Sequence, residues 1–60
     1  MRNVYRQGDR ITWAEAHNGP LLTVLDVIDG QYILEHPDGD KFIRPVHSVD
    51  ETFRLVRPGP

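Results

Sequence analysis

Turn-forming residues recur along this chain at short intervals, and their spacing limits every structural element to a few residues. Gly, Asn, Asp and Pro cluster at residues 7–9, 17–20, 29–30, 37–40 and 57–60. The runs between these clusters are rich in Ile, Val, Leu, Thr, Tyr and Phe, and none has apolar residues at helical spacing over three turns. Short runs of this composition between turn signals predict an antiparallel all-β domain.

Five strands are expected, at residues 10–14, 21–28, 31–35, 41–44 and 52–56. Asp29 and Gly30 separate the second strand from the third, and Asp-Gly between two β-rich runs is the strongest short-range signal for a hairpin. Pro45 cannot donate a backbone hydrogen bond, so it is expected to end the fourth strand. The next residues suit one short 3-10 turn, in which Val46 and Val49 point the same way.

Size and composition limit the class of protein. Sixty residues allow one domain, and a chain this short buries only about 60% of the surface that its unfolded form exposes. There is no cysteine, no apolar run long enough for a membrane helix and no apolar stretch after the first charged residues, as a secretory signal would have. We therefore expect a soluble, cytoplasmic protein, with an N-terminal arm at 1–8, a barrel at 9–56 and a flexible tail at 57–60.

The segment EHPDGDKFIRPV, residues 35–46, places a histidine and three acids close together. Backbone geometry accounts for its centre, because Pro37, Asp38 and Gly39 suit successive positions of a turn. The chain's histidines have no paired metal-ligand spacing, and the acids do not follow the pattern of a calcium loop. A turn between two strands is predicted, with no metal, no cofactor and no catalytic residue.

The middle strands carry more apolar residues than one core needs. In the segment LLTVLDVI, Leu22, Val24 and Ile28 are expected on one face and Leu21, Leu25 and Val27 on the other. A bent strand with a bulge at a barrel corner is one explanation. The other is a second apolar surface, buried in a homo-oligomer or against a protein partner.

We expect that surface to be a protein interface, and Trp13, which alternates with Ile11, to be in the core. An exposed aromatic residue beside an arginine is typical of interface hot spots. The candidate interface residues are Leu25, Ile33, Phe42 and Arg44.

Charge is segregated along the sequence. The net charge is −2, yet residues 11–40 contain six acids and no Lys or Arg, so that all seven basic residues lie outside that stretch. A cluster of terminal arginines beside a tyrosine would suit contacts with nucleic-acid phosphates, which is the alternative function. Its candidate residues are Arg2, Tyr5, Arg6, Arg10, Arg54 and Arg57.

The order of expected strands, turns and the P-V-x-x-V turn before the last strand resembles an SH3-like barrel, with the pattern of its Tudor-like and KOW-like branches. The resemblance covers about residues 8–56 and implies a five-stranded barrel in which the first and last strands are neighbours. The KOW-like branch implies contact with RNA or the ribosome, but its signature glycines and basic residues are missing from HNGPLLTV.

The chain also resembles the plasmid-borne type II dihydrofolate reductases, short SH3-like barrels that assemble as tetramers around one pore. The shared features are GDR at residues 8–10 and KFIRPV at residues 41–46, where the family has Val-Gln-Ile-Tyr-Pro-Val. Phe42 and Arg44 replace the glutamine and tyrosine that would hold folate and nicotinamide. The resemblance therefore implies an architecture, with the enzyme activity as a remote alternative.

Overall fold

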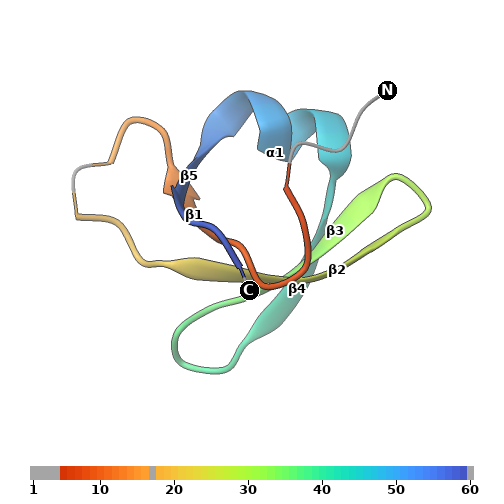
Figure 1. Ribbon diagram of the computed structural model, residues 1–60, viewed down its shortest axis with the longest axis horizontal. Coiled ribbons are helices and arrows are strands. Elements are labelled where there is room, and N and C mark those ends of the chain that lie inside the picture. Colours follow the sequence, from red (N-terminus) through yellow and green to blue (C-terminus); the bar gives the residue numbers. More distant parts are fainter. Residues whose placement is uncertain (1–4, 17, 60) are drawn as a thin grey trace.

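The computed structural model describes residues 5–16 and 18–59 and contains five strands and one short helix (Figure 1). The strands are β1 (Arg10–Trp13), β2 (Leu22–Ile28), β3 (Gln31–Glu35), β4 (Lys41–Pro45) and β5 (Phe53–Arg57), and the helix α1 (Val46–Thr52) joins β4 to β5. The all-β prediction is confirmed, and each strand lies within one residue of its expected limits. In the part of the chain that the structure describes, no helix is long and apolar enough to cross a membrane.

The strands form one antiparallel sheet in the order β4-β3-β2-β1-β5. The first and last strands are paired, as expected, and the arrangement is compatible with a small SH3-like barrel. The sheet is not closed, because β4 and β5 are its two edges and are connected only through α1. The gap between these two edges is called the seam below.

The predicted hairpin between β2 and β3 is confirmed. Ile28 pairs with Gln31, and the two residues between them, Asp29 and Gly30, have φ angles of 50° and 74°. Two positive φ angles in a two-residue loop are the signature of a type I′ turn, whose twist matches that of the flanking strands. Local residue chemistry therefore sets the register of this hairpin.

Strand β2 contains a bulge that changes which of its residues face the core. The pairing with β3 shifts between Val24 and Asp26, which leaves Leu25 as the extra residue. Because one extra residue reverses the alternation that follows it, Val27 packs against the core while Ile28 is 47% exposed. The expectation that Ile28 shares a face with Leu22 and Val24 is therefore wrong.

The core lies between the curved sheet and α1. Its buried members are Tyr5, Ile11, Leu22, Val24, Tyr32, Leu34, Val46 and Val49. The last two belong to α1 and point the same way, as expected. The connection is an α-helix of seven residues rather than a 3-10 turn, so that it covers more of the sheet than the predicted turn would.

Trp13 is at the edge of this core rather than inside it, which corrects the expectation. It is 38% exposed, whereas the two preceding residues, Ile11 and Thr12, are both buried. Trp13 is the last residue of β1, and its ring packs against Phe53 at the end of this strand pair rather than inside the core.

Asp9 connects two described segments that are far apart in the sequence, residues 5–8 and the residues after β5. Its carboxylate accepts hydrogen bonds from the backbone N–H of Arg6 (2.9 Å) and of Gly59 (2.7 Å). The side chain of Tyr5 is buried in the core. Tyr5 therefore packs with the core, and Gly59 is hydrogen-bonded to the residue before β1.

Candidate functional site

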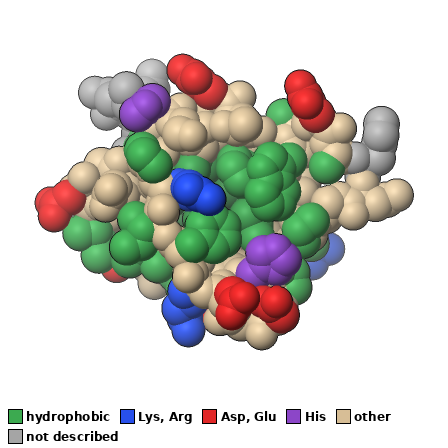
Figure 2. Space-filling model, turned by 180° about the vertical axis from the view of Figure 1, so that it is seen from behind, with side chains coloured by type: hydrophobic (Ala, Val, Ile, Leu, Met, Phe, Trp, Pro, Cys, Tyr) green, Lys and Arg blue, Asp and Glu red, His purple; other side chains and the backbone are tan. Residues whose placement is uncertain are grey.

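A groove of about 430 Å³ lies at the seam, where the sheet is not closed. Its residues come from β1, β4, β5, α1 and the loop between β3 and β4. We call it the seam groove, and it is lined by Trp13, His36, Phe42, Arg44, Ser48, Val49, Thr52 and Phe53. Figure 2 shows hydrophobic side chains gathered at the centre of one face, with a basic side chain beside them and a histidine at the edge above two acidic residues.

Three aromatic rings form the apolar part of the seam groove. Trp13 and Phe53 are cross-strand partners, and their ring centroids lie 4.8 Å apart with a tilt of 36° between the planes. Phe42 lies on the opposite edge strand and packs against the core. The Cζ atom of Arg44 is 5.4 Å from the centroid of the Phe42 ring, within the range of a cation–π contact. The groove therefore combines apolar surface with one oriented positive charge.

Hydrogen bonds from neighbouring segments hold the β5 side of the groove. The hydroxyl of Tyr5 donates to the carbonyl of Phe53 (2.7 Å), and the backbone N–H of Ala14 donates to the carbonyl of Thr52 (2.8 Å). Burial raises the pKa of the Tyr5 phenol, and the carboxylates of Asp50 and Asp9 act in the same direction. Tyr5 is thus held neutral, as a donor to Phe53 must be.

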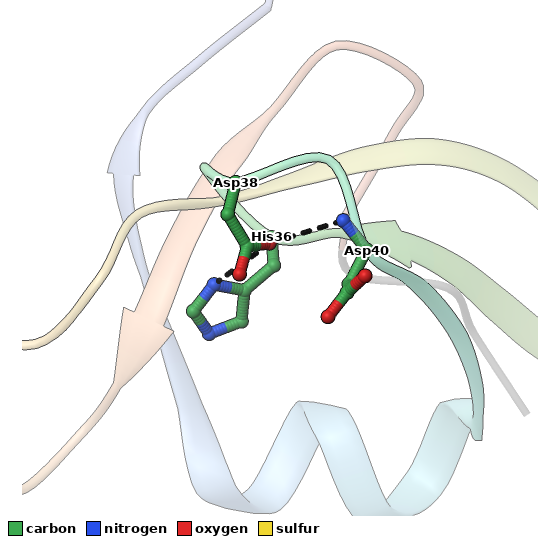
Figure 3. A network of polar contacts seen from close by, with 3 residues as sticks. All are labelled: His36, Asp38 and Asp40. Carbon is green, nitrogen blue, oxygen red and sulfur yellow. Dashed lines mark hydrogen bonds and ion pairs between the residues drawn. The ribbon is translucent and has the colours of Figure 1, made fainter.

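The β3–β4 loop at the end of the groove is a turn, as predicted. The backbone N–H groups of His36 and Gly39 donate to the carbonyls of Asp40 and His36, and Gly39 has a φ of 101°. Asp38 accepts a hydrogen bond from the backbone N–H of Asp40 and lies 3.7 Å from Nδ1 of His36 (Figure 3). Within residues 5–16 and 18–59, no group of three or more His, Cys, Asp or Glu side chains is arranged to hold a metal ion.

A second hollow, of about 370 Å³, adjoins the groove and shares Trp13 and Thr52 with it. Two carboxylates and two alanines complete it. We call it the acidic pocket, and its residues are Trp13, Ala14, Glu15, Ala16, Glu51 and Thr52. Trp13 therefore separates an acidic hollow from one that contains Arg44 and His36.

The predicted interface residues are divided between the two faces of the sheet. Phe42 and Arg44 line the seam groove, opposite Leu34 and Tyr32 in the β3–β4 pairing. Ile33 lies between those two buried residues in sequence, so it points to the outer face, where it pairs with Ile43. The fourth member, Leu25, is the bulge residue of β2 and is partly buried.

Of the residues predicted to contact nucleic acid, two are brought together. Arg10 and Arg57 are cross-strand partners, whereas Arg54 donates to the carbonyl of Ala16 (3.3 Å). Arg6 is exposed. Tyr5 is buried, so its ring is not available for stacking on a base. Arg2 lies outside the described residues.

Sequence reasoning missed Trp13, Phe53 and Glu51 as groove and pocket residues. A signal for the first two existed, since the first and last strands were expected to be neighbours, which can bring a Trp and a Phe together. The acidic pocket had no comparable signal, because Glu15 lies in the loop after β1 and Glu51 lies in α1, far apart in the sequence.

Comparisons with protein-family models, with curated proteins and with solved structures found no match to this chain.

Proposed function

We propose that this protein is a small non-catalytic interaction module, with the topology of an SH3-like barrel, that binds a short segment of another protein in the seam groove. The observation that carries the proposal is the position of three aromatic residues at the one place where the sheet is open. Trp13 and Phe53 stack on one side, and Phe42 with Arg44 lies on the other.

The composition of the groove supports a protein ligand. Tryptophan, other aromatic residues and arginine are the residues most enriched at the energetic centres of protein interfaces. Grooves that combine an apolar surface with a few polar groups bind ligands in a defined orientation. In the seam groove, Arg44 and His36 lie beside the apolar surface and would provide that orientation.

A selection experiment tests the proposal. A phage-displayed library of random peptides is selected against the protein, and the affinities of enriched peptides are measured by calorimetry with Trp13→Ala and Arg44→Ala. We expect each variant to bind roughly tenfold more weakly, as hot-spot residues do. The matched control is Ile43→Ala, since Ile43 follows Phe42 directly but is 55% exposed on the outer face.

Two results would reject the groove as the binding site. One is that Ile43→Ala weakens binding as much as the groove variants do. The other is that no peptide is enriched whose binding depends on Trp13 or Arg44. Circular dichroism of each variant separates loss of a contact from loss of folding.

A second candidate function, nucleic-acid binding, is favoured by the Arg10–Arg57 pair. Like charges directly opposite each other in a sheet are destabilising, and neither arginine forms an ion pair with another described residue. An oligonucleotide phosphate would relieve that repulsion. We expect mixed-sequence RNA or DNA to bind at low salt and to bind less tightly to Arg10→Gln/Arg57→Gln than to Arg44→Gln. Binding that does not change with salt concentration would exclude this function.

A further inference from the structure

We infer that the ligand segment carries a basic side chain next to an apolar one, with the basic side chain in the acidic pocket and the apolar one in the seam groove. This inference rests on the proposed function and names the chemistry of its ligand. The juxtaposition that carries it is an acidic hollow and an aromatic groove on either side of one tryptophan.

The two hollows lie on either side of two shared residues, Trp13 and Thr52, which line both. A chain segment that lies across Trp13 would therefore place neighbouring side chains in different hollows. At about 370 Å³, the acidic pocket is at the lower end of the range of roughly 300–1,000 Å³ found for ligand sites. This volume is large enough to accept the side chain of a lysine or an arginine.

The charges of the acidic pocket favour a cation. Glu15 and Glu51 are exposed, and neither side-chain carboxylate forms an ion pair or a hydrogen bond with another described residue. Arg54 lies nearby, but its guanidinium donates to the carbonyl of Ala16 rather than to either carboxylate. The indole of Trp13 adds the aromatic surface on which ammonium and guanidinium groups bind best.

The charges of the seam groove disfavour a ligand cation, and its rings favour an apolar side chain. Arg44 projects over Phe42, and His36 lies at the same groove, so that a ligand cation there would meet a like charge from Arg44. The three rings instead offer apolar surface to an aliphatic or aromatic side chain. The difference in charge between the two hollows thus sets which ligand residue enters which hollow.

A double-mutant cycle tests the inference, using peptides selected on the wild-type protein. Each peptide is compared with a version in which its Lys or Arg is replaced by Gln, and both are measured by calorimetry with the wild type and with Glu15→Gln/Glu51→Gln. We expect the replacement by Gln in the peptide to weaken its binding to the wild type roughly tenfold. The same replacement should hardly change the peptide's affinity for Glu15→Gln/Glu51→Gln. The control variant is Asp29→Asn/Asp40→Asn, which removes the same charge from exposed positions outside both hollows.

The possible outcomes separate the inference from the function on which it rests. The inference would be overturned if the selected peptides contain no basic residue. It would also be overturned if replacing the peptide's Lys or Arg with Gln weakens binding equally to the wild type, to Glu15→Gln/Glu51→Gln and to the control variant. In either case the proposed function stands if binding still depends on Trp13. If no selected peptide depends on Trp13, both are overturned. Weakening by raised salt in the wild type but not in Glu15→Gln/Glu51→Gln would support the charge contact independently.

Discussion

At the scale of single residues, three buried side chains with hydroxyl groups, Tyr5, Tyr32 and Thr12, show how polar groups are accommodated in the core. The Tyr5 hydroxyl has an acceptor in the Phe53 carbonyl, and its backbone N–H donates to the hydroxyl of Tyr32. That hydroxyl in turn donates to Asp50 (2.9 Å). Thr12 differs, because its buried hydroxyl has no hydrogen-bond partner among the described residues.

Replacing Thr12 with Val should therefore raise the free energy of unfolding, by up to about 1 kcal/mol, since a buried hydroxyl without a partner costs free energy on folding. Urea denaturation measures the change. The control is Thr23→Val, at a partly buried position of β2, for which we expect a change of about 0.5 kcal/mol or less. A clear loss of stability in Thr12→Val alone would show that the hydroxyl contributes a favourable contact.

The raised pKa of Tyr5 predicts how stability changes in alkali. Because the folded state holds the phenol proton more tightly than the unfolded chain does, the stabilisation is complete below the unfolded pKa of about 10. It is lost as the pH rises through the folded pKa. We expect the denaturation midpoint of the wild type to fall as the pH rises above about 10, with a shallower slope in Tyr5→Phe. Equal slopes would contradict a role for Tyr5.

At the scale of elements, the sequence predicted the turns whose geometry depends only on residues adjacent in the chain. The Asp29–Gly30 hairpin and the turn at His36–Asp40 follow from the conformations that these residues favour. The bulge at Leu25 could not be predicted, because it depends on how β2 pairs with β3. The exposure of Trp13 could not be predicted either, because it depends on where β1 ends beside the open edge of the sheet. The seam groove could not be predicted for the same reason, since its width depends on the separation of β4 and β5.

Gly30 gives a test of the hairpin. A Cβ atom at this position would meet no atom within 4 Å, so any loss of stability in Gly30→Ala comes from the φ of 74° alone. We expect a loss of about 1 kcal/mol in Gly30→Ala and a smaller loss in Gly30→Asn, because asparagine tolerates the left-handed region. Thermal unfolding of the three proteins measures both. Equal losses in the two variants would contradict the type I′ assignment.

At the scale of the whole molecule, the five-stranded sheet leaves apolar side chains exposed on two sides. The seam groove holds Phe42 and the Trp13–Phe53 pair, and the outer face exposes Ile28 and Ile43. The sequence predicted the surplus of apolar residues on the middle strands. It did not predict that Phe42 and Ile33 lie on opposite faces, so that one interface cannot use both. The groove side, with its aromatic rings and Arg44, is the one that we assign to the partner.

The most direct test of the seam groove uses the fluorescence of Trp13, which is the chain's single tryptophan. A peptide selected on the wild-type protein, itself free of tryptophan, is titrated into the protein while the emission spectrum is recorded. Binding in the groove should remove water from the partly exposed indole and shift its emission to shorter wavelength, saturating at the affinity measured by calorimetry. Calorimetric binding that leaves the emission of Trp13 unchanged would place the ligand elsewhere and contradict the proposed site.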